Sequence, residues 1–300
     1  MNILLALDLS AGSQVAVNEV AMRPWPARTP VHVIGVADTE KLPFAPSVVE
    51  EILARTRTAI NGAAERLKSV GLAATSRVVS GDPRMMIVEH AKEIGADLII
   101  VGAHSAAGVV GFLLGSVAKA VIRMAPCSVE IARPTHRVPG HYPGMKVLLA
   151  VDESDYSLAA AQAIAARPWP AESEIRVMSV VDLSSSFLQS AFEPAFVDPA
   201  GMDELREQAV QRAQNAIMEA REIISDAGLR TSEYLSVLLE DPKKAILEEA
   251  KEWGAELIAV GSHGRRGFQR FMLGSVSEAV AMHAACTVEI IRAPQPAEHP

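Results

Sequence analysis

The sequence has few cysteines, few aromatic residues and no long apolar run. Its two cysteines among 300 residues cannot form a disulfide framework, so a reducing cytoplasm is the simplest setting. No apolar run approaches the ~20 residues that a membrane-spanning helix needs. The apolar start at 1–10 lacks a basic segment and contains Asp8, which is typical of a buried strand and not of a signal peptide. We expect a cytoplasmic protein with no membrane partner.

Positive charge is also scarce. The chain carries 28 Lys and Arg against 36 Asp and Glu, which gives a net charge of −8 at pH 7. Because contacts to nucleic-acid phosphates need clustered Lys and Arg, this balance argues against nucleic acid as a partner. With 49% hydrophobic and 21% charged residues, the chain is too apolar to be disordered over most of its length.

Several motifs of catalytic nucleotide-binding proteins are missing. The chain contains no GxxxxGK[ST] loop of a P-loop NTPase and no GxSxG turn of a serine hydrolase. After the first strand pattern stands ALDLSAG, where a dinucleotide-binding domain has GxGxxG. The SGG-x-DS loop of adenylating enzymes is absent as well. We therefore expect no enzyme activity beyond a slow ATPase.

The sequence does contain one pattern written twice. The matching pairs include ILLALDLS at 3–10 with VLLAVDES at 147–154, RPWP at 23–26 with RPWP at 167–170, and LLGSVAKAV at 113–121 with MLGSVSEAV at 272–280. The offset grows from 144 to 159, so the second copy carries 15 extra residues between Asp182 and Asp241. Because this period is too long for a solenoid repeat, we interpret each copy as a whole domain. The first copy is 1–133 and the second copy is 145–294, joined by a linker at 134–144 rich in Pro, Gly and His.

Strand and helix patterns alternate within each copy. In the first copy they predict strands at 3–7, 31–36, 75–79, 97–101 and 128–132, and helices at 10–23, 48–70, 82–95 and 116–124. The second copy repeats this order with a longer helix at about 203–227. Five strands alternating with four helices predict an α/β fold with a doubly wound, mostly parallel sheet. Such sheets bind ligands beyond the carboxyl ends of the strands, where the strand order reverses.

The most informative segment is the loop GSHGRRGFQRFMLGS at 261–275. Its glycines let the backbone approach a ligand closely. The pair Gly274-Ser275 stands where the next helix begins, so free N–H groups and the helix dipole favour an anion there. Hydrogen-bond donors and positive charge come from His263, Arg265, Arg266 and Arg270. This composition favours a phosphate site over the simple turn that one glycine would indicate.

The pattern G-x2-G-x9-G-[ST], set between a buried strand and a helix, resembles the nucleotide-binding members of the universal stress protein family. The resemblance covers nearly the whole chain twice, which implies a tandem member. It implies two flavodoxin-like, Rossmann-like domains with sheet order 3-2-1-4-5 that form an intramolecular pseudo-dimer through their last strands. It also implies a stress-response regulator or sensor that binds ATP with Mg²⁺.

The family's site residues can be carried over onto matching positions. In the second copy, Asp152 and Val180 would contact adenine, and Gly261, Gly264, Gly274 and Ser275 would hold the ribose and phosphates. The first copy departs from the pattern, because its loop at 102–116 has Ser105 in place of the second glycine and contains no Lys or Arg. Its weaker, corresponding site comprises Asp8, Val36, Gly102, Gly115 and Ser116. We therefore expect ATP mainly in the second copy, and no metal site formed by side chains.

Five points stay open. Asp8 and Asp152 are also placed to cap the helices that follow them. Glu130 and Glu289 put charge into the last strands, and charge on an edge strand discourages pairing. The insert at 183–200, which we expect to be among the least ordered segments, is a lid, a partner surface or a packed loop. The alternative function is a nucleotide-free scaffold that binds a protein or an apolar ligand through this insert. Whether the chain forms a further homo-oligomer, or has an unknown protein partner, also stays open.

Overall fold

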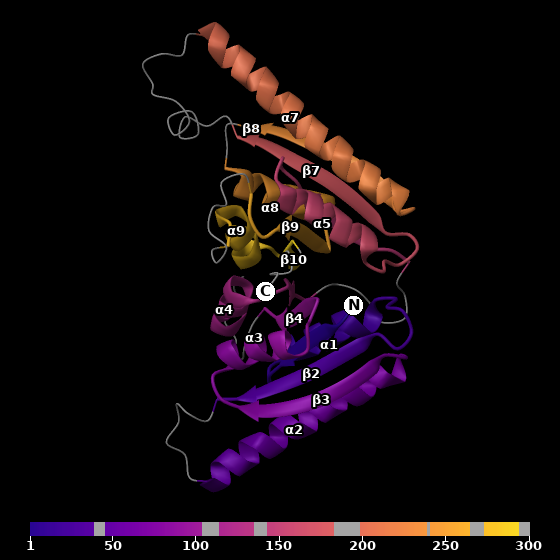
Figure 1. Cartoon of the computed structure of the whole chain (residues 1–300), viewed down its shortest axis with the longest axis vertical. Coiled ribbons are helices and arrows are strands. Elements are labelled where there is room, and N and C mark those ends of the chain that lie inside the picture. The colour runs from indigo at the N-terminus through magenta and orange to yellow at the C-terminus, as the bar shows by residue number, and fades with distance from the viewer. Residues whose placement is uncertain are drawn as a thin grey trace, which may run out of the picture. The chain divides into compact units, whose positions relative to one another are not determined.

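The structure is a computed structural model of the chain (Figure 1), and it describes residues 1–38, 46–103, 114–134, 143–182, 199–238, 241–264 and 273–293. Contacts within the chain divide it into two compact units. The first unit contains 1–142, 168–170 and 281–290, and the second contains 143–167, 171–280 and 291–300. Residues 281–290 of the second sequence copy therefore belong to the first unit. The domain boundaries at 133 and 145 remain a prediction.

The first copy has the expected alternation of strands and helices. Its elements are β1 (Ile3–Leu7), α1 (Ala11–Met22), β2 (Pro30–Ala37), α2 (Pro46–Ser69), β3 (Ala73–Ser80), α3 (Pro83–Glu93), β4 (Leu98–Gly102), α4 (Ser116–Met124) and β5 (Ser128–Ala132). The five strands are parallel in the order β3-β2-β1-β4-β5. This is the order that the resemblance implied, and the doubly wound α/β fold is confirmed.

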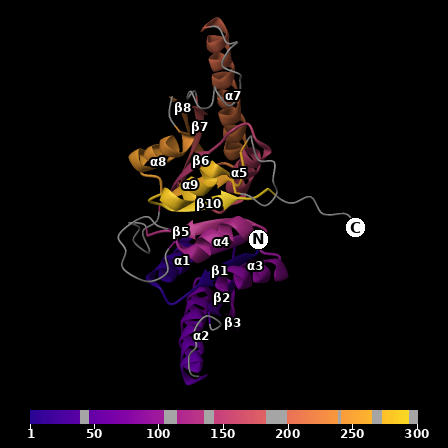
Figure 2. The ribbon, with the colours of Figure 1, turned by 90° about the vertical axis from the view of Figure 1, so that its left-hand side faces the viewer.

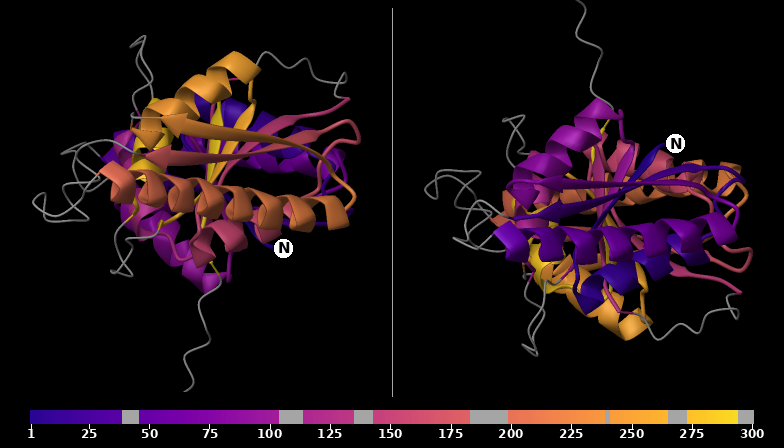
Figure 3. Two further views of the ribbon diagram at one scale, coloured as in Figure 1. Left: turned by 90° about the horizontal axis from the view of Figure 1, so that it is seen from above. Right: turned by 90° about the horizontal axis from the view of Figure 1, so that it is seen from below.

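The second copy repeats these elements. They are β6 (Lys146–Ala150), α5 (Asp155–Ala166), β7 (Glu174–Asp182), α7 (Pro199–Asp226), β8 (Arg230–Leu238), α8 (Pro242–Trp253), β9 (Leu257–Gly261), α9 (Ser275–His283) and β10 (Thr287–Ile291). In the second unit, the parallel strands have the order β9-β6-β7-β8. Figure 3 shows the two long helices in equivalent places, α2 along β2 and β3, and α7 along β7 and β8.

Local sequence signals explain where the elements begin and end. All five residues of β1 are buried, as expected for a parallel strand covered on both faces. Asp82 is the N-cap of α3 and accepts a hydrogen bond from the N–H of Arg84, with Pro83 at the first helical position. The chain leaves α2 through Gly71, whose φ is 91°. Glycine adopts such a positive φ at little cost in free energy, because it has no side chain.

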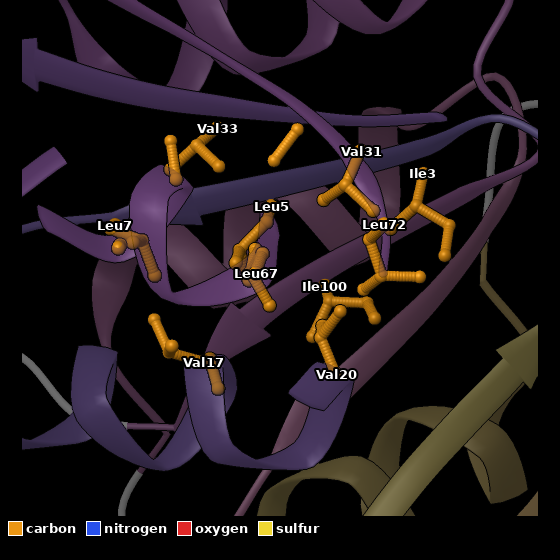
Figure 4. Close-up of a cluster of buried hydrophobic side chains, with 14 of the residues drawn as sticks. Ile3, Leu5, Leu7, Val17, Val20, Val31, Val33, Leu67, Leu72 and Ile100 are labelled. Atoms are coloured by element: carbon orange, nitrogen blue, oxygen red, sulfur yellow. The ribbon is translucent and has the colours of Figure 1, made fainter. Parts of the chain in front are cut away.

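The core of the first copy lies between its sheet and the α1–α2 pair. Figure 4 shows aliphatic side chains of β1 facing α1, with Leu67 of α2 beside them. The labelled members are Ile3, Leu5, Leu7, Val17, Val20, Val31, Val33, Leu67, Leu72 and Ile100, all buried. Removing this much apolar surface from water is the main stabilising contribution to such a domain.

The last strands of the two sequence copies pair with each other. β10 runs antiparallel to β5, with Glu289 opposite Glu130, and Figure 2 shows the two strands side by side. Both carboxylates are fully buried, and an Nη atom of Arg23 lies 2.6 Å from Oε2 of Glu130 and 3.0 Å from Oε1 of Glu19. The charges do not prevent pairing, because the buried guanidinium compensates them. This confirms that the copies join through their last strands.

Two expectations concern segments that are described only in part. Of the insert at 183–200, residues 183–198 lie outside the described residues, and α7 begins at Pro199. The roles considered for the insert, and its low order, stay predictions. Among the helices in the described part of the chain, none is both long and apolar enough to cross a membrane.

Candidate functional site

Asp152, directly beyond β6, is held in place by two serines. Its Oδ1 accepts hydrogen bonds from the N–H of Ser154 at 3.0 Å and from the hydroxyls of Ser154 and Ser157. The N–H of Asp152 donates to Oγ of Ser157 at 2.8 Å. The N-cap of α5 is Ser154 and not Asp152, so the capping interpretation of the aspartate is wrong. The carboxylate is oriented through Oδ1, and Oδ2 faces the glycine loop described below.

The first copy builds the same arrangement around Asp8. Its Oδ1 accepts from the N–H of Ser10 at 2.9 Å, from the Ser10 hydroxyl, and from the Ser13 hydroxyl at 2.7 Å. The N-cap of α1 is Ser10. The signal for these serines was present in the sequence as a repeated D-x-S-x-x-S, in DLSAGS at 8–13 and DESDYS at 152–157.

Gly264 approaches Asp152 too closely for any side chain. A Cβ atom at Gly264 would lie 2.7 Å from Oδ2 of Asp152, and that carboxylate cannot turn away without losing its serine hydrogen bonds. A Cβ at Gly261 would lie 2.9 Å from the carbonyl oxygen of Tyr156. The two glycines are therefore required by the close approach of the loop to the start of the second copy.

Gly274 closes the other side of the loop. Its N–H donates to the carbonyl oxygen of Ser262 at 2.8 Å, and a Cβ there would lie 3.2 Å from Cα of His263. The structure thus brings Asp152, Gly261, Gly264 and Gly274 together around one loop. Ser275 is exposed and begins α9, where the first-turn N–H groups have no partner within the helix.

Val180 and the loop arginines are less closely connected to this group. Val180 is half-buried in β7, two residues beyond Met178, whose carbonyl oxygen accepts from the N–H of Val151 at 2.8 Å. The arginines that the sequence singles out are Arg265, Arg266 and Arg270, which lie outside the described residues. We call Asp152, Val180, Gly261, Gly264, Gly274 and Ser275 the second-copy site.

His263 contributes a buried nitrogen for which the described residues provide no partner. The side chain is 8% exposed, and its Nδ1 lies 3.1 Å from Oγ of Ser262. Its ring packs against that of Tyr156, with 4.8 Å between the ring centroids. Among the residues that the structure describes, Nε2 has no hydrogen-bond partner, although buried polar atoms in folded proteins usually have one. An imidazole nitrogen beside a glycine loop is suited to a ligand's polar group.

The first copy contains a cavity of ≈ 120 Å³ beyond the carboxyl ends of β1, β2 and β4. We call it the first-copy cavity. It is lined by Ala6, Leu7, Asp8, Ser10, Ser13, Ile34, Val36, Pro83, Ile87, Val101, Gly102, Gly115, Val117 and Ala118. Four of the five residues of the weaker site line it, and Ser116 begins α4 beside them. The topology therefore assembles a cavity where the strand order reverses.

Comparison with known proteins decides the family. The model of the universal stress protein family matches residues 1–133 and again 145–292. The chain belongs to the universal stress protein family. Because the match occurs twice, this universal stress protein is a tandem member.

Relatives of this universal stress protein include both single and tandem chains. Universal stress protein Rv2623 of Mycobacterium tuberculosis is 27% identical over 304 residues, covering 97% of this chain and 96% of the relative. Universal stress protein YxiE of Bacillus subtilis is 30% identical over 147 residues, covering 49% of this chain and 98% of the relative. The crystal structure of a universal stress protein from Archaeoglobus fulgidus has a TM-score of 0.69 at 20% identity, covering 98% of both chains. That likeness shows the shared fold.

Proposed function

We propose that this universal stress protein binds ATP with Mg²⁺ at the second-copy site and acts as a stress-response regulator whose state depends on the nucleotide. The observation that carries the proposal is the close packing of Gly264 on the anchored Asp152 carboxylate. A Cβ atom at Gly264 would lie 2.7 Å from Oδ2 of Asp152. This packing holds the start of the glycine loop against a fixed hydrogen-bond acceptor. The same loop is followed by a helix N-terminus, which favours phosphate.

The residues present fit this ligand. In the proposal, Asp152 and Val180 contact the base, while Gly261, Gly264, Gly274 and Ser275 hold the ribose and phosphates. Gly274 packs closely against Ser262 and His263, and its N–H donates to the Ser262 carbonyl oxygen, so it would shape the phosphate loop. His263 would place its Nε2, which has no hydrogen-bond partner in the described part of the chain, toward a polar atom of the nucleotide. The phosphates would bring Mg²⁺ with them, as they do in many nucleotide sites.

The proposed role is binding and not turnover. When bound, the nucleotide supplies the negative charge of its three phosphates. The residues of the chain hold the nucleotide in position. The serine-bound carboxylate of Asp152 is fixed by three hydrogen bonds to Oδ1, which suits a recognition group. Any ATPase activity would therefore be slow.

Calorimetric titration with ATP and Mg²⁺ tests the proposal. We expect about one site per chain, and we expect Gly264→Val to abolish it, because the new side chain would displace the Asp152 carboxylate. Ser116→Ala at the start of α4 is the matched control in the first copy and should leave ATP binding unchanged. Two equal sites, or one that survives Gly264→Val, would place the nucleotide elsewhere. No ATP binding, with no 260 nm absorbance released on denaturation, would favour the nucleotide-free scaffold.

A further inference from the structure

The two copies carry different side chains where β2 meets α3 and where β7 meets α8. In the second copy, Nη1 of Arg176 on β7 lies 2.5 Å from Oε1 of Glu249 on α8. Nε of the same arginine donates to Oγ of Ser232 on β8 at 3.4 Å, and the guanidinium lies 4.3 Å from the ring centre of Trp253. A paired arginine and glutamate are both ionised at neutral and mildly acidic pH, so this is a permanent ion pair.

The first copy has two histidines at the equivalent positions. His32 of β2 corresponds to Arg176 at the repeat offset of 144, and His90 of α3 corresponds to Glu249 at the later offset of 159. The two imidazole rings lie edge to face, with 6.4 Å between their centroids and 82° between their planes. Thr75, opposite His32 in the strand pairing, has its Oγ1 3.1 Å from Nδ1 of His32. The first copy therefore keeps the contact but replaces the permanent charges with two groups that titrate near neutral pH.

The charged groups that face this pair come from α3 and β3. Nδ1 of His90 lies 2.9 Å from Oε2 of Glu93 and 3.1 Å from Nη1 of Arg77, and this Nη1 also donates to the Glu93 carboxylate. On the β1 side, the strand neighbour of His32 is the buried Leu4. In the part of the chain that the structure describes, no carboxylate pairs with His32. A proton on His90 is thus stabilised by Glu93, whereas a proton on His32 faces a second imidazole.

The surroundings of His32 disfavour its charged form. Burial and the neighbouring His90 ring lower the pKa of His32 from its ordinary value of 6.5. A histidine whose pKa falls on folding stabilises the protein above that ordinary value, and the stabilisation is lost as the pH falls below it. When both rings carry a proton, His32, His90 and Arg77 are cations that face the carboxylate of Glu93. Because His90 is only 8% exposed, water screens this repulsion less than it would on an open surface.

We propose that the His32–His90 pair is a pH-sensitive contact, which holds the C-terminal half of α3 on the sheet of the first copy at neutral pH and releases it in mildly acidic solution. The second copy holds α8 at the equivalent place with an ion pair that keeps its charges. The structure of the first copy therefore responds to acidity at this contact, and that of the second copy does not. Since α3 contributes Pro83 and Ile87 to the lining of the first-copy cavity, its release would also change that wall.

Hydrogen exchange measured by mass spectrometry on the full chain tests the proposal. Peptides from α3 and from α8 are compared at pH 7.5 and pH 5.5, after correction for the intrinsic pH dependence of amide exchange. We expect the protection of α3 to fall several-fold at the lower pH, while the protection of α8 stays the same. A loss of protection in α3 that is no larger than the loss in α8 would overturn the proposal.

A double substitution copies the chemistry of the second copy into the first. His32→Arg with His90→Glu should form an ion pair in place of the two imidazoles, so the protection of α3 should become as insensitive to pH as that of α8. The control is His283→Gln, at an exposed histidine at the end of α9, which should keep the response of the unmodified chain. A pH response of α3 that survives the double substitution would contradict the role of this pair.

A second measurement leaves His32 itself unchanged. The ring-proton signals of His32 are followed by NMR as the pH is lowered, in the unmodified chain and in His90→Gln. Because this substitution removes the neighbouring charge but not the burial, the titration midpoint of His32 should move to higher pH and stay below 6.5. A midpoint that stays in place or moves to lower pH would show that the two rings do not act as a pair. Neither measurement involves a nucleotide, so the proposed function is tested separately by ATP binding.

Discussion

Glu130 shows how far the environment of one residue can depart from what its type suggests. It is fully buried in β5, opposite Glu289 of β10. Burial, against the opposing effect of the Arg23 guanidinium and together with the Glu19 and Glu289 carboxylates, raises the pKa of the Glu130 carboxyl to about 7. Burial alone would lower the pKa of Arg23, but the carboxylates of Glu130, Glu19 and Glu289 outweigh it and raise that pKa. The rings of Trp25 and Trp169 flank the guanidinium at 5.6 and 5.4 Å.

This pKa predicts how stability depends on pH. Between about pH 4.5 and 7 the folded protein keeps the Glu130 proton that the unfolded chain has lost. The free energy of unfolding therefore falls as the pH rises through this window, by an amount on the order of 2–3 kcal/mol from this group. Glu130→Gln should remove that part of the pH dependence. Urea unfolding at pH 5 and pH 7.5 measures it, with Glu65→Gln on the exposed face of α2 as the control.

The test depends on the difference in the free energy of unfolding between pH 5 and pH 7.5, and not on its value at one pH. If Glu130→Gln keeps the full pH dependence of the unmodified chain, the proton is held by another group. Glu65 pairs with Lys68 at 2.8 Å in an exposed position, so its loss should leave the pH dependence as it was.

At the scale of elements, the packing of α2 on β2 depends on one glycine. A Cβ atom at Gly35 would lie 2.6 Å from Cγ1 of Ile60 and 2.8 Å from Cγ2 of Thr56. β2 and α2 can therefore pack this closely only because position 35 has no side chain. By contrast, Gly62 in the middle of α2 is exposed, and a Cβ there would meet nothing within 4 Å.

Two glycine substitutions should consequently have opposite effects. Gly35→Ala should lower the free energy of unfolding by about 1–3 kcal/mol, because the added methyl group overpacks the interface. Gly62→Ala should raise it by about 0.5–1 kcal/mol, because alanine favours the helix and restricts the unfolded chain. Chemical unfolding of both variants measures the difference. Equal effects of the two substitutions would show that α2 does not pack against β2 as described.

At the scale of the whole molecule, the end of the first copy is bound to the end of the second. The N–H of Arg133 donates to Oγ1 of Thr287 at 3.2 Å, and its guanidinium donates to the carbonyl oxygens of Cys286, at 3.3 Å, and Ala281. The side chain is nearly fully buried, and burial lowers the pKa of Arg133 to about 10. A charge is kept inside the protein here because main-chain carbonyls solvate it.

Arg133→Met should therefore destabilise the whole chain. The substitution keeps most of the side-chain volume but leaves buried carbonyl oxygens without donors, at a cost of about 2–4 kcal/mol. Thermal unfolding measures the shift, and Arg66→Met on the exposed surface of α2 is the control that should leave the midpoint nearly unchanged. A midpoint for Arg133→Met equal to that of the control would mean that these hydrogen bonds contribute little to joining the copies.

The sequence by itself determined the fold class, the order of the elements, the two copies and the family. These follow from signals within one short segment, such as an apolar run, an Asp-Pro helix start or a glycine after a helix, or from comparison of two segments. Predicted helix 116–124 and strand 128–132 agree residue for residue with α4 and β5. The loop glycines could also be singled out, since their spacing is written in the chain.

Only the tertiary structure decided which of these residues meet. The pairing of Glu130 with Glu289, and its compensation by Arg23, joins positions more than a hundred residues apart. The approach of Gly264 to Asp152 and the first-copy cavity likewise depend on where loops from separate strands end. The physical reason is that burial and close contact are properties of the folded arrangement. Long-range packing decides which charged groups face each other and which side chains meet a backbone, and no single segment of the sequence contains that information.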